Sequence, residues 1–167
     1  AGNAESGGEG EAIAATMKAL NTVTICLCRQ IAADGEGATR LLECKVTGAP
    51  TLADAKLAAK SVVCSSLFKA AIFGADANWG RVLCALGYSG ANIDVDKIEV
   101  AFRSPAGIIT VCENGAGVDF SEEEAKKILL EKEIEVLVDL HQGTAASAAW
   151  GCDLTYDYVR INGGYRT

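Results

Sequence analysis

The spacing of apolar residues changes its period along this chain of 167 residues, and these changes constrain its fold most. From Ile13 to Ile31 apolar residues recur in alternating steps of four and three, which is the period of an amphipathic helix. Over residues 40–47 they alternate with charged residues, as in a strand with one buried face. Helical and strand periods within one domain-sized chain predict an α+β fold, a layered mixed sheet with helices.

The rest of the chain shows the same two periods, separated by capping residues and turns. Thr51 can cap a helix, and Ser121 with Glu124 forms a capping box for another. Gly163 is expected to end the last helix. Further helices are expected at residues 51–65, 78–86, 121–132 and 157–161. Further strands are expected at residues 98–102, 108–112, 134–140 and 146–152, the first two forming a hairpin.

Charge and hydropathy exclude several classes of partner. The net charge is −7 and the 15 basic residues are scattered, which argues against a nucleic-acid partner. The longest purely apolar stretches fall short of the roughly 18 residues that a membrane span needs, so no membrane association is expected. Residues 1–10 are rich in Gly and are expected to be a flexible lead-in to a single domain over residues 11–167.

Seven cysteines are spread along the chain without a metal-binding pattern. Their number is odd, none forms a Cys-x-x-Cys pair, and His141 is the one histidine available to complete a site. We therefore expect no metal site. Reduced, mostly buried thiols in a cytoplasmic protein are the expected state.

The end of the chain, residues 149–167, is unusually apolar, whereas chain ends are commonly polar and frayed. Its apolar and aromatic residues are Trp150, Leu154, Tyr156, Tyr158, Val159, Ile161 and Tyr165. Because so much apolar surface is costly to leave in water, this tail is expected to dock on the domain. It would then either complete the core only, or hold Asn162 and Thr167 in place as one wall of a site.

A turn rich in glycine follows the first predicted helix, at Asp34-Gly35-Glu36-Gly37. Two glycines permit unusual backbone angles and place the Glu36 carboxylate at an exposed tip. The turn is either a plain helix cap or a means of presenting this carboxylate to a ligand amine through a charge-assisted hydrogen bond.

A second segment of this kind runs from Gly74 to Arg81. Asp76 or Asn78 can cap the helix that follows, and Arg81 can pair with Asp76. We assign no catalytic role to these side chains and expect a packing corner.

Together these segments are similar to a known family. The three stretches are Asp34-Gly35-Glu36-Gly37-Ala38-Thr39-Arg40, the run from Ile72 to Arg81, and the tail from Trp150 to Thr167. In this order and at about this spacing they resemble the ornithine acetyltransferases, also called bifunctional glutamate N-acetyltransferases. The resemblance covers essentially the whole chain, and implies the C-terminal, β-chain part of that family's fold.

The resemblance implies an activity and a substrate site. Members of the family move an acetyl group from N-acetylornithine to glutamate through an acetyl-Thr intermediate, without a cofactor, and some also use acetyl-CoA. In the matching positions the family's Glu, Asn and terminal Thr contact substrate, which implies substrate-binding roles for Glu36, Asn162 and Thr167. Gly163-Gly164 stand where the family has Ala-Glu, so this tail is expected to be looser.

The family's nucleophile is a Thr that becomes an N-terminus when the precursor cleaves itself. Ala15-Thr16-Met17-Lys18 is similar to that cleavage site, but Thr16 lies within the helical period and too close to Glu36. We expect no catalytic residue in this chain, which would need a companion α chain and a further β-chain segment in a hetero-oligomer. Alone, it is expected to be inactive. The alternative is a non-catalytic binding or assembly domain left without its catalytic half.

Overall fold

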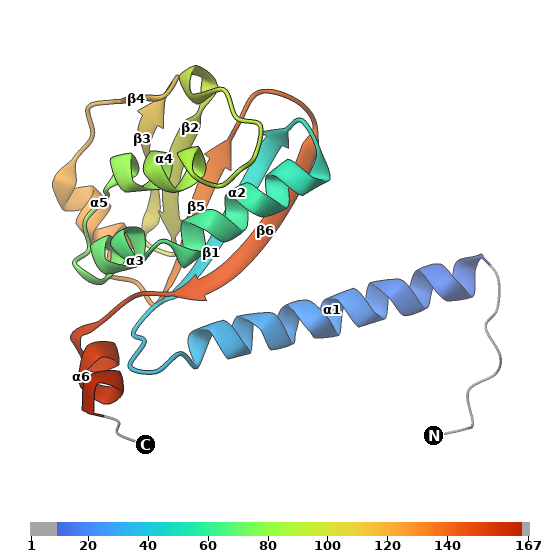
Figure 1. Ribbon diagram of the computed structural model, residues 1–167, viewed down its shortest axis with the longest axis horizontal. Coiled ribbons are helices and arrows are strands. Elements are labelled where there is room, and N and C mark those ends of the chain that lie inside the picture. Colours follow the sequence, from blue (N-terminus) through green and yellow to red (C-terminus); the bar gives the residue numbers. More distant parts are fainter. Residues whose placement is uncertain (1–9, 165–167) are drawn as a thin grey trace.

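A six-stranded sheet with helices packed on one face forms the centre of the fold, which a computed structural model describes for residues 10–164 (Figure 1). The strands are β1 (Leu41–Ala49), β2 (Glu99–Ser104), β3 (Gly107–Glu113), β4 (Ala116–Gly117), β5 (Glu133–Asp139) and β6 (Ala145–Cys152). Their order in the sheet is β4-β3-β2-β5-β1-β6. β1 and β5 are parallel and the other neighbours are antiparallel, so the expected mixed α+β sheet is confirmed.

Six α-helices and one short 3-10 helix complete the described chain. They are α1 (Glu11–Ala33), α2 (Leu52–Cys64), α3 (Ser66–Phe73), α4 (Trp79–Gly87), η1 (Val95–Lys97), α5 (Glu122–Leu129) and α6 (Tyr156–Gly164). Thr51, Asn78 and Ser121 cap α2, α4 and α5 through their side chains. The capping predicted for Thr51 and Ser121 is thereby confirmed.

The core lies between the sheet and the helices α2 to α5 (Figure 1). Alternation along β1 places Leu42, Cys44 and Val46 in the core and Glu43 on the opposite face, as predicted. The alternation predicted for β5 is confirmed in the same way. The core includes a stacked pair, Phe68 of α3 and Phe102 of β2, with ring centroids 6.3 Å apart. One face of the sheet is therefore buried against the helices, and the other carries charged side chains.

The structure differs from the prediction in several details, and β4 and η1 are among the elements that were not predicted. α3 was not predicted. α5 ends at Leu129 rather than near residue 132, because the carbonyl of Lys132 already accepts from the backbone N–H of Leu41 in the sheet. Gly163 does not end the last helix, since α6 continues to Gly164 without a positive φ at either glycine.

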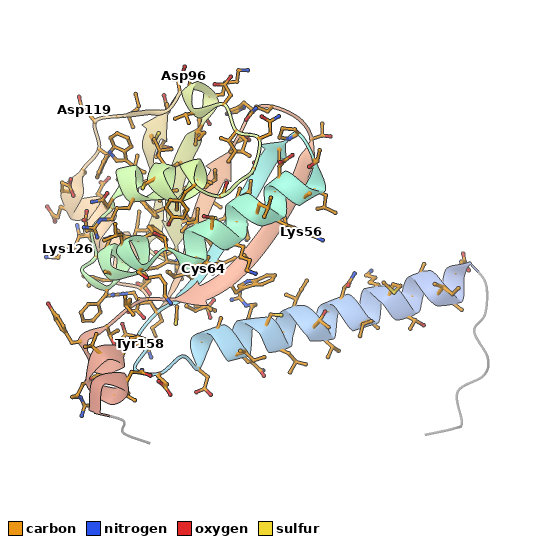
Figure 2. The ribbon with its side chains drawn as sticks, viewed as in Figure 1. Lys56, Cys64, Asp96, Asp119, Lys126 and Tyr158 are labelled. Carbon is orange, nitrogen blue, oxygen red and sulfur yellow. The ribbon has the colours of Figure 1, made fainter. Side chains whose placement is uncertain are left out.

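The first helix projects away from the sheet (Figure 1), and its side chains stand in open space over most of its length (Figure 2). None of its residues is buried. Its exposed large apolar residues are Ile13, Met17, Leu20, Val23, Ile25, Leu27 and Ile31. By length and composition alone α1 could also cross a membrane, a criterion that core helices of other proteins meet as well. The apolar period predicted for this helix is present, but nothing among residues 10–164 covers it.

All seven cysteines are free thiols, but only Cys44 and Cys112 are buried and four of the seven are exposed, so the expectation of mostly buried thiols is wrong. Residues 10–164 contain no group of three His, Cys, Asp or Glu that could hold a metal ion. Burial raises the pKa of the Cys44 thiol, and the Glu43 carboxylate raises it further. Burial likewise raises the pKa of Cys112.

Because the thiolate is the reactive form, we expect a thiol reagent at neutral pH to leave Cys44 and Cys112 unmodified while it labels Cys64 and Cys84, which are exposed. Mass mapping of the labelled, folded chain measures this, and labelling of Cys44 without unfolding would contradict the fold.

Candidate functional site

The turn after α1 is shaped by two glycines that allow the C-terminal segment to approach closely. A Cβ at Gly35 would lie 2.6 Å from Sγ of Cys152, at the end of β6. Gly37 has a φ of +67°, and a Cβ there would lie 2.8 Å from Cβ of Asp157 and 2.9 Å from the backbone nitrogen of Tyr158. At Gly37 a side chain would displace the backbone of the tail, whereas at Gly35 it would force the Cys152 side chain to move. Glu36, between them, is therefore held at an exposed tip beside α6.

Two of the three predicted site residues are in direct contact. Nδ2 of Asn162 donates to Oε2 of Glu36 at 2.8 Å, although the two residues lie 126 positions apart in the chain. The same nitrogen donates to the carbonyl of Tyr158 at 2.9 Å. Both Nδ2 hydrogens are thus used, which leaves the other Glu36 oxygen and Oδ1 of Asn162 as acceptors. Thr167 lies outside the described residues.

This arrangement changes what Asn162 can recognise. From the sequence, its amide was expected to serve as both donor and acceptor toward an amino acid. In the structure Asn162 and Glu36 together offer only acceptor atoms. The pair therefore suits a ligand group that carries N–H donors, such as an ammonium, whereas a ligand carboxylate needs a donor from elsewhere.

A buried carboxylate holds the start of β1 against the tail. The side chain of Asp153 is fully buried and accepts from the backbone nitrogens of Thr39 at 2.8 Å and Arg40 at 3.0 Å. It also accepts from the hydroxyl of Thr39, and it forms an ion pair with the Arg40 guanidinium at 3.7 Å. A buried charge is tolerated only when it is paired and hydrogen-bonded in this way.

The second segment joins the same network. Arg40 donates from one guanidinium nitrogen to the carbonyls of Ile72 at 2.9 Å and Phe73 at 3.0 Å, at the end of α3. The ring of Phe73 meets that of Tyr156 edge to face, with centroids 5.4 Å apart. The three stretches that resembled one family therefore meet at one corner of the fold.

Beyond that contact, the second segment is a packing corner, as expected. Oδ1 of Asn78 accepts from the backbone nitrogen of Arg81 at 3.1 Å, and its Nδ2 donates to Asp76 at 3.0 Å. The expected pairing of Arg81 with Asp76 is wrong. The Arg81 guanidinium instead donates to the carbonyl of Leu67 at 2.7 Å, because α4 packs against α3.

The tail docks only in part. Asp153 and Thr155 are buried, and Trp150 and Leu154 are half-buried. Tyr156 and Val159 of α6 are 83% and 63% exposed, so the expectation that the tail buries its apolar residues is wrong for this helix. α6 touches the body at the turn before β1 rather than lying on the sheet (Figure 2).

A groove of about 620 Å³ lies beside the Glu36 turn, between the C-terminal end of α1, α2 and β6. Its walls include Ile31, Gly35, Lys69, Trp150 and Cys152. The indole nitrogen of Trp150 is buried there without a hydrogen-bond partner within the described part of the chain. The groove is thus mostly apolar and adjoins the site, although neither Glu36 nor Asn162 lines it.

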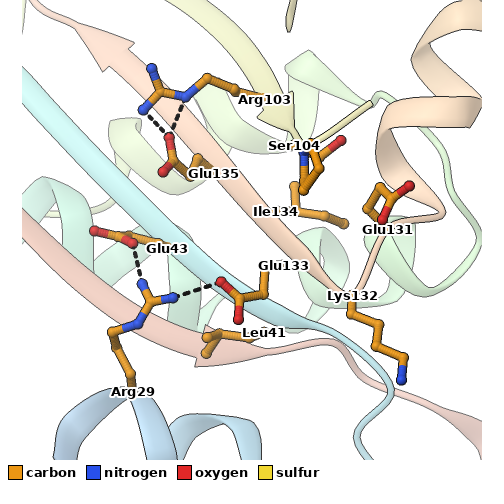
Figure 3. A pocket seen from close by; sticks show the side chains of 11 residues that line it. Arg29, Leu41, Glu43, Arg103, Ser104, Glu131, Lys132, Glu133, Ile134 and Glu135 are labelled. Atoms are coloured by element: carbon orange, nitrogen blue, oxygen red, sulfur yellow. Dashed lines mark hydrogen bonds and ion pairs between the residues drawn. The ribbon is translucent and has the colours of Figure 1, made fainter. Parts of the chain in front are cut away.

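A second cavity, of about 470 Å³, lies on the charged face of the sheet (Figure 3). There Arg29 of α1 reaches Glu43 at 2.6 Å and Glu133 at 2.7 Å, and Arg103 pairs with Glu135. These carboxylates and guanidinium groups pair with one another, so we interpret the cluster as the attachment of α1 to the sheet.

Sequence reasoning missed Arg40, Asp153 and Thr155. All three stand inside the segments that carried the resemblance, but nothing in their spacing distinguishes them from ordinary surface polar residues. Their importance follows from burial and long-range hydrogen bonds. Each needs a partner more than 30 positions away along the chain.

Comparison with other proteins gives one consistent result. The ArgJ family model matches residues 1–167. The chain is 56% identical over 150 residues to the arginine biosynthesis bifunctional protein ArgJ of Caldanaerobacter subterraneus, covering 90% of this chain and 37% of that protein. It is 50% identical over 167 residues to ArgJ of Thermotoga neapolitana, covering 100% of this chain and 42% of that protein.

An archaeal relative and a solved structure agree. The glutamate N-acetyltransferase of Methanopyrus kandleri is 48% identical over 151 residues, covering 90% of this chain and 39% of that protein. The crystal structure of ArgJ from Bacillus halodurans superimposes with a TM-score of 0.89 at 47% identity, covering 98% of this chain and 75% of that one. The chain thus spans between 37% and 42% of the length of these curated relatives. With its whole length matched by the family model, the chain belongs to the ArgJ family.

Proposed function

We propose that this chain is part of an acetyltransferase of arginine biosynthesis that transfers acetyl from N-acetylornithine to glutamate. The observation that carries this proposal is the contact of Asn162 with Glu36 at 2.8 Å. Two residues to which the resemblance assigns substrate binding, 126 positions apart in the chain, form one pair that offers acceptor atoms to a ligand. Relatives named as glutamate N-acetyltransferase or as bifunctional arginine biosynthesis protein support the assignment.

In the proposed reaction a Thr hydroxyl on a further segment attacks the acetyl carbon of N-acetylornithine. The carbon–nitrogen bond breaks, the amine leaves with a proton, and an acetyl-Thr ester remains. The glutamate amine then attacks this ester, the carbon–oxygen bond breaks, and the hydroxyl regains its proton. Glu36 and Asn162 hold nitrogen groups of the amino-acid substrates by accepting their hydrogen bonds. For Thr167, which lies outside the described residues, the proposal is that its hydroxyl also binds substrate.

Trapping the acetyl-enzyme tests the function. The complete enzyme that contains this chain is incubated with N-acetylornithine, and then either with glutamate or with hydroxylamine. An acetyl ester found on a Thr by intact mass, converted to N-acetylglutamate or to acetohydroxamate, supports the proposal. If neither an acetyl-enzyme nor acetyl transfer is detected, the proposal is wrong. Replacing N-acetylornithine by acetyl-CoA in the same assay identifies a second donor.

The exposed apolar side of α1 supports a hetero-oligomeric enzyme. Met17, Leu20 and Leu27 are about half exposed, and an apolar surface of this extent on one helix is typical of an interface. We propose that α1 packs against the companion chain and the further β-chain segment, which would supply the nucleophile. This chain alone would then be inactive.

Cysteine labelling provides a test of that interface, since Cys26 and Cys28 of α1 are exposed. In the isolated chain both are expected to react with a thiol reagent, and in the complete enzyme at least one should be protected more than about tenfold, because packed thiols exclude the reagent. Cys84 of α4 serves as the control. Equal labelling of both α1 cysteines in the two forms would exclude the proposed interface.

A second candidate is a domain that binds or assembles without catalysis. The exposure of the Glu36 and Asn162 pair and of most of α1 favours it for this chain in isolation. Detection of amino-acid binding by the complete assembly, with no acetyl-enzyme formed, would distinguish it from the acetyltransferase.

A further inference from the structure

We propose that Thr155 is a positioning residue that sets the distance between Glu36 and Asn162, an inference that rests on the substrate-binding role proposed for this pair. Thr155 is 5% exposed and lies between the end of β6 and the start of α6. Its hydroxyl donates to the carbonyl of Gly37 at 2.7 Å and accepts from the backbone nitrogen of Tyr158 at 3.3 Å. One hydroxyl thus contacts both segments that carry the pair.

These contacts are part of a closed ring. The Thr155 hydroxyl binds the carbonyl of Gly37, which follows Glu36 in the chain, and receives the N–H of Tyr158. The carbonyl of Tyr158 accepts from Nδ2 of Asn162, which returns to Glu36 through its second hydrogen. Two of the hydrogen bonds in the ring fix the first turn of α6 relative to the Glu36 turn, and the other two orient the Asn162 amide.

Thr155 is important here because, within the described chain, few contacts hold α6; besides the ring of hydrogen bonds, Tyr156 meets Phe73 edge to face. This helix has nine residues and no buried side chain, and isolated helices of fewer than about 12–15 residues are marginal in water. The Thr155 hydroxyl caps its first turn as an N-cap oxygen does. At Gly37 the absence of a side chain lets the start of α6 approach the turn. The hydroxyl therefore contributes both to the formation of α6 and to its position against the Glu36 turn.

A pair of substitutions isolates the hydroxyl. Thr155→Val keeps the shape but loses both hydrogen bonds, whereas Thr155→Ser keeps them. In the complete enzyme we expect Thr155→Val to raise KM for glutamate about tenfold with kcat changed by less than about threefold, the size expected for one binding contact. Thr155→Ser should stay within about twofold of the unchanged enzyme. If the Val variant does not assemble, Thr155→Ala, which cannot clash, replaces it.

A double-mutant cycle with Glu36→Gln separates positioning from plain structure. If Thr155 acts through Glu36, its substitution should raise KM no further once Glu36 is Gln. A loss of melting temperature with unchanged KM, or a KM effect that adds in full to that of Glu36→Gln, would overturn the proposal for Thr155. An unchanged KM in Glu36→Gln itself would instead contradict the function proposed for the pair. The two failures are therefore distinguishable.

Discussion

Glu36→Gln is expected to lower kcat/KM of the complete enzyme about 100-fold while the fold stays intact. The substitution keeps the size of the side chain but removes its negative charge. A charge-assisted hydrogen bond is worth about 1.5–3 kcal/mol, and a loss of about 2.7 kcal/mol corresponds to a factor of 100. Because Glu36 is exposed, its replacement should hardly change stability. Steady-state kinetics with glutamate and with N-acetylornithine measure the loss.

The matched control is Glu123→Gln on α5. Glu123 is also an exposed carboxylate and pairs with Lys127 at 2.9 Å, but it lies on a helix that covers the far part of the sheet. The activity of the Glu123→Gln enzyme should stay within about twofold of that of the unchanged enzyme, as is usual for surface substitutions. If Glu36→Gln behaves like this control, the carboxylate does not bind substrate.

Asp153→Asn should destabilise the fold by about 3–5 kcal/mol, the usual cost of removing one partner of a buried ion pair. The Asn amide would direct hydrogens toward the backbone N–H groups of Thr39 and Arg40, or give up one of those acceptor contacts. Arg40, itself only slightly exposed, would lose its counter-charge. The free energy of unfolding in urea, measured on the unchanged and variant proteins, gives the difference.

Glu133→Gln is the control for this stability prediction. Glu133 also pairs with an arginine, Arg29, at 2.7 Å, but its side chain is 64% exposed. Ion pairs open to solvent contribute about 0–1 kcal/mol, so the control should be nearly neutral. A cost below about 1 kcal/mol for Asp153→Asn would show that the buried network does not hold the three segments together.

Local pattern is sufficient for most of the helices and strands. Alternation such as that of Leu42, Cys44 and Val46 depends only on the strand period, so β1 and β5 could be located from the residues alone. α3 was missed because its N-cap, Ser65, was taken only as the end of the preceding helix, and just the short stretch from Ser66 to Phe73 follows it. An eight-residue helix inside such a stretch has too few turns to show its own period.

For the candidate site, too, some features could be predicted from the sequence and others required the fold. Glu36 and Asn162 were candidates from their segments, since glycines flank the one and an apolar tail carries the other, and their substrate-binding role was implied by the family resemblance. Their contact, the burial of Asp153 and the role of Thr155 required the fold. β6 pairs with β1 in antiparallel register, with Cys152 opposite Leu41, and this pairing returns the tail to the turn after α1.

The residue pattern of this chain therefore establishes its α+β class, its main elements and its family, and it indicates Glu36 and Asn162 as candidate site residues. The folded arrangement alone decides that α1 and α6 stay exposed, that the Asp153 carboxylate is buried, and that the Thr155 hydroxyl joins the Glu36 turn to α6. The physical reason is the separation along the chain over which each effect acts. Periodicity and capping act over a few neighbouring residues, whereas burial and the ring through Thr155 depend on pairing between residues more than 100 positions apart.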